Sequence, residues 1–311
     1  MERNDTTGSW DSIVIGGGAA GMSAALTLAR ARRTVLVVDA GGQSNLVASG
    51  IRGLIGHDGR SPADFYAAGR AELAAYPTVD VRDGTVTRAV REEDGTFRAV
   101  LEEHGDQRAK TMVLTPGMEY RRPQLPGLDE RWGGSVFHCP FCHGWEVRDR
   151  RLAVLAEGAV GVHGALNLRT YSDRVTLLTN GAELTGPQRD QLAAGGVGLD
   201  ERPLRALEGP GTDLRAAVFE DGTELPVDAL LVKSYLHQRS SLALDLGATL
   251  TGSNEMLGVE AITVDAMGAT GVPGLYAAGD AATSVPPSVA AAVASGYLAG
   301  AAASVHLAAG Y

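Results

Sequence analysis

Several residue types are scarce in this chain of 311 residues. Lysine occurs only at Lys110 and Lys233, and aromatic residues make up 5% of the sequence. The formal net charge of −10 argues against nucleic acid as a partner, because nucleic-acid binding requires a basic surface. Since aromatic residues are few, the core must be built mainly from Ala, Val and Leu.

Sequence signals for export and for membrane insertion are also weak. Residues 1–8 are polar and contain no apolar stretch of the kind found in signal peptides, so we expect a cytoplasmic protein. The segment from Val289 to Gly310 is almost uncharged, but it is rich in Ala, Gly and Ser and only weakly hydrophobic. It therefore predicts a buried helix and no contact with a membrane.

The only two cysteines, Cys139 and Cys142, are separated by two residues and flanked by His138 and His143. Two thiols at this spacing can form a disulfide and often have a lowered thiolate pKa, which favours a redox-active pair. Three other interpretations stay open for the motif alone: a structural disulfide, a zinc site and the attachment of c-type haem. No metal is expected, because nothing resembling a second ligand pair follows.

The N-terminal region has the order of elements that is typical of a dinucleotide site. An apolar strand, a glycine-rich turn, a helical pattern and a second apolar strand follow one another between residues 12 and 39. Gly16 permits the tight turn, Gly18 lets a pyrophosphate approach the backbone, and Gly21 lets the helix lie close to the sheet. The helix N-terminus would face the phosphates, and Asp39 could accept hydrogen bonds from ribose hydroxyls.

Residues 152–178 repeat the strand, helix, strand order but lack the ligand-binding features. Ala156 stands at the first glycine position of the turn, and Glu157 puts a carboxylate where a phosphate would meet backbone amides. The second strand ends in Thr179-Asn180-Gly181, with no acid for a 2′-hydroxyl and no arginine for a 2′-phosphate. We therefore expect a dinucleotide-type domain that does not bind NADPH. The alternative is weak binding with Glu157 turned away.

The remaining regions add a helix, further strands and a possible ligand contact. Ser61-Pro62 predicts the start of a helix, and four β-type runs between residues 79 and 114 predict an antiparallel appendage. Asp280 follows a predicted strand and suits a ribityl or phosphate contact, although it could also be an ordinary helix cap. A loop through Pro286 leads to a helix starting near Ser288, whose N-terminus carries positive potential.

Together these motifs resemble those of the low-molecular-weight thioredoxin reductase flavoproteins. The likeness covers nearly the whole chain and rests on residues 16–21, Asp39, Gly41-Gly42-Gln43, Thr115 to Gly117, Cys139-x-x-Cys142 and Gly279-Asp280. The resemblance implies an α/β fold of two Rossmann-like, three-layer ββα domains. The FAD-binding domain would be split into residues 1–118 and 239–311. The inserted domain, 119–238, would be a degenerate NADPH-type domain that carries the cysteine pair.

The resemblance also implies FAD as cofactor, a homodimer, and roles for single residues. Cys142 would lie nearest the flavin, and Cys139 would meet the substrate. The residues expected to hold FAD are Gly16, Gly18, Ala19, Ala20, Gly21, Asp39, Ala40, Gly42, Gln43, Asn45, Thr115, Gly117, Gly279, Asp280, Ser288 and Val289.

Two departures from the reductases point to a narrower group. The basic run expected after the second strand of the inserted domain is absent, and His143 stands where the reductases carry an aspartate. The hexapeptide from Cys139 to Gly144 resembles that of the dithiol oxidases that close disulfides in small natural products, the holomycin and gliotoxin oxidases. Trp145 and the chain length suggest the bacterial, holomycin-type member.

This resemblance implies an FAD-dependent dithiol oxidase that passes electrons from a small-molecule dithiol to O2 and forms H2O2, in biosynthesis and self-protection. Only thiolates are nucleophilic, so a nearby base is needed, and His143 and possibly His138 are candidates. Two alternatives remain. One is a thioredoxin-disulfide reductase fed by NADPH or ferredoxin, and the other is a non-catalytic flavin-binding redox sensor.

Overall fold

The computed structural model describes residues 9–103, 105–252, 259–282 and 287–310. Two compact units emerge. Unit 1 comprises Met1–Ser44, Ala63–Tyr120 and Leu236–Tyr311, and unit 2 comprises Asn45–Pro62 and Arg121–Tyr235. Residues 45–62, which the sequence analysis assigns to the first domain, thus cluster with the cysteine-bearing unit. The predictions for residues 1–8 and for the loop at Pro286 lie outside the described residues.

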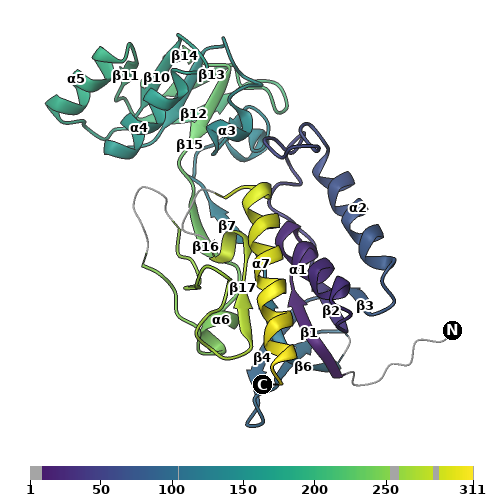
Figure 1. The fold of residues 1–311 in the computed structure, drawn as a ribbon. Helices are drawn as coiled ribbons and strands as arrows, with labels where there is room; N and C mark the ends of the chain where they lie inside the picture. The colour runs from purple at the N-terminus through teal and green to yellow at the C-terminus, as the bar shows by residue number, and fades with distance from the viewer. Residues whose placement is uncertain (1–8, 104, 253–258, 283–286, 311) are drawn as a thin grey trace. The chain divides into compact units, whose positions relative to one another are not determined.

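Unit 1 is built around a seven-stranded sheet (Figure 1). Its parallel part has, in spatial order, β3 (Val79–Asp83), β2 (Val35–Asp39), β1 (Ser9–Ile15), β6 (Gly105–Leu114) and β17 (Leu275–Ala277). The antiparallel part extends from the first half of β6 through β5 (Phe97–Leu101) to β4 (Val86–Arg91). The glycine turn after β1 and the end of β2 therefore lie at the same edge of the sheet, because neighbouring parallel strands end together.

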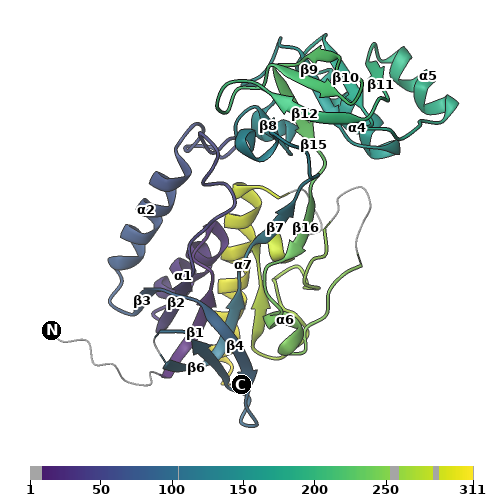
Figure 2. The same cartoon turned by 180° about the vertical axis from the view of Figure 1, so that it is seen from behind.

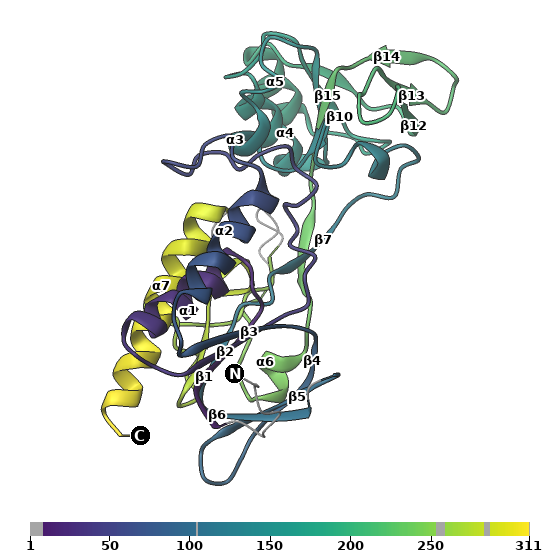
Figure 3. The same ribbon diagram turned by 90° about the vertical axis from the view of Figure 1, so that its right-hand side faces the viewer.

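Successive side chains of the central strands point to opposite faces of this sheet, as strand geometry requires. Val14 packs with helices α1 (Ala19–Arg30) and α7 (Val289–Ala308), whereas its neighbour Ile13 packs with residues of β4 and β5. Figure 3 shows α1 and α7 on one side of strands β1 to β3 and β4 on the other. Unit 1 is thus a helical layer, a parallel sheet and an antiparallel layer.

Helices α1 and α7 lie side by side, as Figures 1 and 2 both show. An added Cβ at Gly296 would lie 2.1 Å from the Ala20 carbonyl oxygen, and one at Gly300 would lie 2.6 Å from that of Ala24. By length and composition α7 is apolar enough to cross a membrane. Close contact with α1 explains the small residues Gly296 and Gly300. Only 28% of the apolar stretch of α7 is buried, so the predicted burial holds only for the face that packs on α1.

Unit 2 repeats the three layers with a smaller sheet. Its five parallel strands are, in spatial order, β11 (Gly198–Asp200), β10 (Val175–Leu178), β9 (Leu152–Leu155), β15 (Ala229–Val232) and β8 (Val136–Phe137). An antiparallel sheet of β12 (Leu204–Glu208), β13 (Ala216–Phe219) and β14 (Glu224–Pro226) adds a second layer.

The faces of this sheet again pack on different partners. Val154 joins a core with α4 (Gly158–Leu168) and α5 (Gly186–Ala194), whereas the adjacent Ala153 joins a core with β12 and β13. Thr185 is the N-cap of α5 and forms a capping box with Gln188. The predicted α/β fold of two three-layer, Rossmann-like units is confirmed.

Two predicted strands differ from expectation. β3 and the second half of β6 were expected in an antiparallel appendage, but both pair in parallel within the main sheet. β3 is an edge strand whose residues are mostly half-buried, so it shows none of the continuous apolar run that marks a buried parallel strand. The hairpin of β4 and β5 is antiparallel as predicted.

The other elements are α2 (Pro62–Ala74), β7 (Met118–Arg121), η1 (Asp129–Arg131), α3 (Pro140–His143), β16 (Tyr235–Gln238), α6 (Leu242–Asp245) and η2 (Gly279–Ala282).

Candidate active site

The two cysteines lie at the start of a short helix in unit 2. Cys139 is the N-cap of α3, and Pro140 occupies the first helical turn, where its missing N–H is not needed. Cys139 and Cys142 form a disulfide, with their Cα atoms 5.3 Å apart. The amide of Cys142 donates to the Cys139 carbonyl at 3.2 Å. One helical turn therefore holds both sulfurs in bonding geometry.

Both histidines of the motif stack on aromatic rings. The ring centroids of His138 and Trp132 are 5.6 Å apart, and those of His143 and Phe137 are 5.3 Å apart with an interplanar angle of 14°. Burial and the nearby His143 lower the pKa of His138 from 6.5 to about 4. Burial also lowers the pKa of His143. With the disulfide closed, both rings are therefore predominantly neutral at pH 7, and a neutral imidazole can accept a proton.

The low pKa of His138 should make stability depend on pH. As the pH falls below 6.5 the unfolded chain takes up a proton that the folded protein takes up only near pH 4, so the contribution of His138 is complete above pH 6.5 and lost between these values. We expect His138→Gln to lose less stability than the wild type between pH 7 and pH 4, by up to about 3 kcal/mol. Urea unfolding at several pH values measures this difference.

The matched control is His163→Gln, which replaces an exposed histidine of α4. It should follow the wild-type pH dependence. If the His138 and His163 variants lose equal stability in acid, the assignment of a neutral, buried His138 would be wrong.

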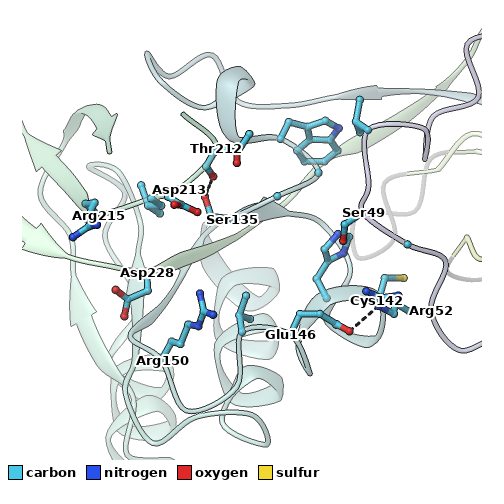
Figure 4. Close-up of a pocket in the computed structure, with 18 of the residues that line it drawn as sticks. Ser49, Arg52, Ser135, Cys142, Glu146, Arg150, Thr212, Asp213, Arg215 and Asp228 are labelled. Atoms are coloured by element: carbon cyan, nitrogen blue, oxygen red, sulfur yellow. Dashed lines mark hydrogen bonds and ion pairs between the residues drawn. The ribbon is translucent and has the colours of Figure 1, made fainter. Parts of the chain in front are cut away.

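A cavity of about 700 Å³ lies within unit 2 beside the cysteine pair (Figure 4). Of the two cysteines, Cys142 is the one that lines it, together with His143. Arg150 and Asp228 lie across the cavity from Cys142 in Figure 4. A volume of this size is typical of small-molecule sites, which span about 300–1,000 Å³.

Part of the cavity wall comes from the segment 45–62. Val47, Ser49 and Arg52 contribute to the lining, and Arg52 Nε donates to Glu146 Oε1 at 2.7 Å. Sequence analysis missed both partners of this ion pair. They are 94 residues apart and belong to no motif, so no local signal could have paired them.

The glycine turn before α1 has very little room. An added Cβ at Gly16 would lie 2.2 Å from the Thr115 carbonyl oxygen, and one at Gly21 would lie 1.8 Å from the carbonyl oxygen of Gly16. Gly18 differs, because the one neighbour within 4 Å of its added Cβ is Gln43 Cγ, at 3.8 Å. Gly18 is the N-cap of α1 and provides no side-chain cap, so the first amides of the helix are open to an anionic ligand. This geometry fits a pyrophosphate.

Asp39 ends β2 and is only 4% exposed. Its carboxylate accepts hydrogen bonds from the Gly41 amide at 3.1 Å, from the Gln43 side chain at 3.1 Å and from Arg70 Nη2 at 2.6 Å. The structure thus brings Gln43 and Asp39 together. It adds Arg70 of α2, which sequence analysis missed because nothing in that helix marks a binding residue.

Asp280 lies in η2, shortly after β17, and is partly buried. Burial raises its pKa, while a hydrogen bond from the Tyr120 hydroxyl at 3.1 Å and the charge of Arg239 act in the opposite direction. Arg239 donates to the carbonyl oxygens of Met118 and Gly42. Tyr120 and Arg239 were also missed by sequence analysis. Tyr120 contacts the predicted cofactor residue Asp280, and Arg239 contacts the backbone at the predicted residue Gly42 and next to the predicted Gly117.

The other predicted cofactor residues divide between the two units. Unit 1 contains Ala19, Ala20, Ala40, Gly42, Thr115, Gly117, Gly279, Ser288 and Val289, whereas Asn45 clusters with unit 2. Thr115 is buried, and its hydroxyl donates to the carbonyl oxygens of Ile15 and Gly16, which holds the glycine turn. Ser288 is the N-cap of α7, and its hydroxyl accepts from the Ala291 amide at 3.1 Å.

The second dinucleotide-type turn, between β9 and α4, keeps its packing glycine. An added Cβ at Gly161 would lie 2.6 Å from the Ala156 carbonyl oxygen, so α4 still lies close to the sheet. Glu157 is the N-cap of α4; its side chain is exposed and makes no capping bond. The N-cap of α4 is therefore an acidic residue, at the helix end where a phosphate would bind in a functional turn, and its carboxylate is not bonded to the helix amides.

The end of β10 is also unsuited to a nucleotide ribose. The side-chain oxygen of Asn180 accepts a hydrogen bond from the Leu204 amide at 2.7 Å, so it is committed to the fold. Arg202, beyond the neighbouring strand β11, pairs with Asp200 at 2.6 Å and with Asp221 at 3.1 Å. Its guanidinium is therefore already neutralised and is poorly placed to recognise a 2′-phosphate.

Comparisons with known proteins agree with this architecture. Residues 10–296 match the family described as pyridine nucleotide-disulphide oxidoreductase. The chain is 32% identical to the thioredoxin reductase tcpT of Claviceps purpurea over 310 residues, which cover 96% of this chain and 94% of that protein. It therefore belongs to the pyridine nucleotide-disulphide oxidoreductases and is an oxidoreductase enzyme.

Solved structures show the same likeness over almost the whole chain. The oxidoreductase from Agrobacterium tumefaciens is 35% identical with a TM-score of 0.89, and the aligned part covers 97% of this chain and 99% of that one. The crystal structure of HlmI is 33% identical with a TM-score of 0.90, covering 97% and 94% of the two chains. The predicted resemblance to thioredoxin reductase-like proteins is confirmed.

Proposed function

We propose that this protein is an FAD-dependent dithiol oxidase that closes an intramolecular disulfide in a small molecule and uses O2 as the acceptor. The observation that carries the proposal is the second dinucleotide-type turn, where Glu157 occupies the helix N-terminus and Asn180 is engaged with the backbone. An NADPH-fed enzyme needs this site. A dithiol oxidase receives its electrons from the substrate and does not.

FAD fits the first dinucleotide-type site. Gly18 leaves backbone amides open at the start of α1, Asp39 is a buried carboxylate at the end of β2, and Asp280 is a partly buried carboxylate in η2. We propose that Gly18 faces the pyrophosphate and that Asp39 and Asp280 bind hydroxyl groups of the cofactor. Bound FAD would accept the two electrons of the reduced cysteine pair and return them to O2, giving H2O2.

The residues of unit 2 would carry out the thiol chemistry. A substrate thiolate attacks the Cys139 sulfur, which breaks the Cys139–Cys142 bond, forms a mixed disulfide and releases the Cys142 thiolate. The second substrate thiolate then attacks the substrate sulfur of the mixed disulfide. The substrate disulfide closes and Cys139 leaves as a thiolate, so two electrons have moved to the cysteine pair. Neutral His143 takes up a proton from a substrate thiol.

The substrate class follows from the cavity and from the sequence resemblance. A space of about 700 Å³ suits a compact molecule, and the hexapeptide around the cysteines resembles that of the holomycin-type oxidases. We propose a dithiolopyrrolone-like dithiol, whose oxidation would serve both biosynthesis and self-protection. The same resemblance leads us to propose a cytoplasmic homodimer.

A second candidate function is a thioredoxin-disulfide reductase supplied by NADPH or ferredoxin. It is favoured by the names of relatives, such as the Claviceps purpurea protein described as a thioredoxin reductase. The two functions differ in the source of electrons. In the oxidase they enter at the cysteine pair, whereas in the reductase they leave from it.

Anaerobic reduction of the yellow holoenzyme separates these functions. A small dithiol should bleach the flavin band within the turnover time, and air should restore it with one H2O2 per dithiol oxidised. We expect NADPH to reduce the flavin at least about 100-fold more slowly, because the charge of Glu157 at the N-cap of α4 opposes its phosphates. A monothiol of the same scaffold is the control. Rapid bleaching by NADPH would favour the thioredoxin-disulfide reductase function. No response to either donor would favour a redox sensor.

A further inference from the structure

The ion pair between Arg52 and Glu146 lies at the cavity beside His143. Both side chains line the cavity together with Cys142 and His143, and Figure 4 shows Arg52 next to Cys142. The Arg52 and Glu146 side chains are 20% and 35% exposed, so their charges are only partly screened by water. The amide of Glu146 donates to the His143 carbonyl at 3.1 Å, which fixes the carboxylate-bearing turn to the histidine.

The His143 ring is held from several sides. It stacks on Phe137, and the nearby Gly133 backbone raises its pKa. Gly133 is in turn positioned by the segment 45–62, because an added Cβ there would lie 2.7 Å from Val47 Cγ2 and its φ is +82°. In the described part of the chain, His143 Nδ1 is buried and has no hydrogen-bond partner.

We propose that Glu146 and Arg52 are positioning residues for His143, the carboxylate favouring the imidazolium and the guanidinium limiting that effect. The inference rests on the proposed function, in which His143 is the base. It gives the segment 45–62 a role, because this segment carries Arg52, which lies far from Glu146 in the sequence.

The charges around His143 act in known directions. Its burial lowers the pKa most, Glu146 raises it and Arg52 lowers it. The nearby His138, which follows β8, is itself neutral at pH 7 because its pKa is about 4. The two members of the ion pair thus have opposite effects on the same ring.

Single substitutions test this opposition in the holoenzyme. The dithiol-dependent flavin reduction should have an acidic limb that reports the pKa of His143, since only the neutral ring is a base. We expect Glu146→Gln to move this limb to lower pH and Arg52→Gln to move it to higher pH, each by about half a unit or more. The double variant should lie near the wild type. Arg189→Gln, which removes a 2.6 Å pair with Glu201 outside the cavity, is the control and should leave the limb in place.

Histidine NMR of the oxidised holoenzyme gives a readout that does not need turnover. The His143 resonance, assigned with His143→Gln, should titrate with the same opposite shifts. The inference would be overturned if the His143 pKa shifted in the same direction in both variants or did not shift. An ion pair with a purely structural role would affect the pKa in the same way whichever partner is removed. Opposite shifts of the His143 pKa by NMR, with no shift in the acidic limb of the rate profile, would also overturn it. Such a result would mean that His143 is not the base in flavin reduction. Failure of the wild type to react with any dithiol would instead overturn the proposed function.

Discussion

Replacing Cys142 with serine is expected to lower dithiol oxidation by about 1,000-fold or more while the protein remains yellow. In the proposed mechanism the disulfide between Cys139 and Cys142 receives the substrate electrons, and serine cannot form it. FAD binding should persist, because the predicted cofactor residues in unit 1 are unchanged. Oxygen consumption with a small dithiol measures the activity, and flavin absorbance after desalting measures cofactor content. Activity within tenfold of the wild type would remove the cysteine pair from the reaction.

The matched variant Cys139→Ser tests which sulfur meets the substrate. The family resemblance assigns this role to Cys139, whereas the cavity is lined by Cys142. A lone thiolate can open a cyclic substrate disulfide to give a mixed disulfide, with no net change in oxidation state. We expect intact-mass spectrometry to detect this adduct in Cys142→Ser, where Cys139 is free. Adduct formation only in Cys139→Ser would reverse the assigned roles.

A methyl group at Gly18 and one at Gly21 are expected to have different consequences. At Gly21 an added Cβ would lie 1.8 Å from the Gly16 carbonyl oxygen, so α1 would have to move away from the turn. We expect Gly21→Ala to lower the free energy of unfolding by about 3 kcal/mol or more and to abolish FAD binding with it.

Gly18→Ala should leave the fold nearly intact, because its φ is −74° and the nearest neighbour of the added Cβ is 3.8 Å away. The change of N-cap should cost at most about 1 kcal/mol. FAD affinity should nevertheless fall by about 10- to 100-fold, since the methyl group would occupy the space that we assign to the pyrophosphate.

Urea unfolding of the apoprotein and fluorescence titration with FAD measure the two effects separately. Wild-type affinity in Gly18→Ala would place the pyrophosphate elsewhere. Equal destabilisation by the two substitutions would mean that the contacts around the turn differ from those described.

Local patterns in the sequence predicted most of the fold. Buried strands such as β2 and β9 are continuous apolar runs, and the glycine turn before α1 has a spacing that few other structures require. The main error concerned β3. It pairs in parallel at the edge of the sheet, where partial burial produces the same mixed pattern as an antiparallel strand. Strand direction depends on the path of the chain between strands, which periodicity does not encode.

The sequence by itself determined the cysteine pair, its flanking histidines and the glycine turn before α1. It also determined that the second turn lacks phosphate-binding features, since Ala156 and Glu157 stand there. Each of these features depends on residues adjacent along the chain. Only the tertiary structure decided which residues surround them. Arg70 reaches Asp39, Tyr120 reaches Asp280, and Arg52 reaches Glu146 from another segment of the chain. Each contact adds a charged or hydrogen-bonding side chain to the surroundings of residues that the motifs predicted. These contacts come from packing between segments that are distant in the sequence. The residues around a charged side chain do not indicate which distant residue it will contact in the folded protein.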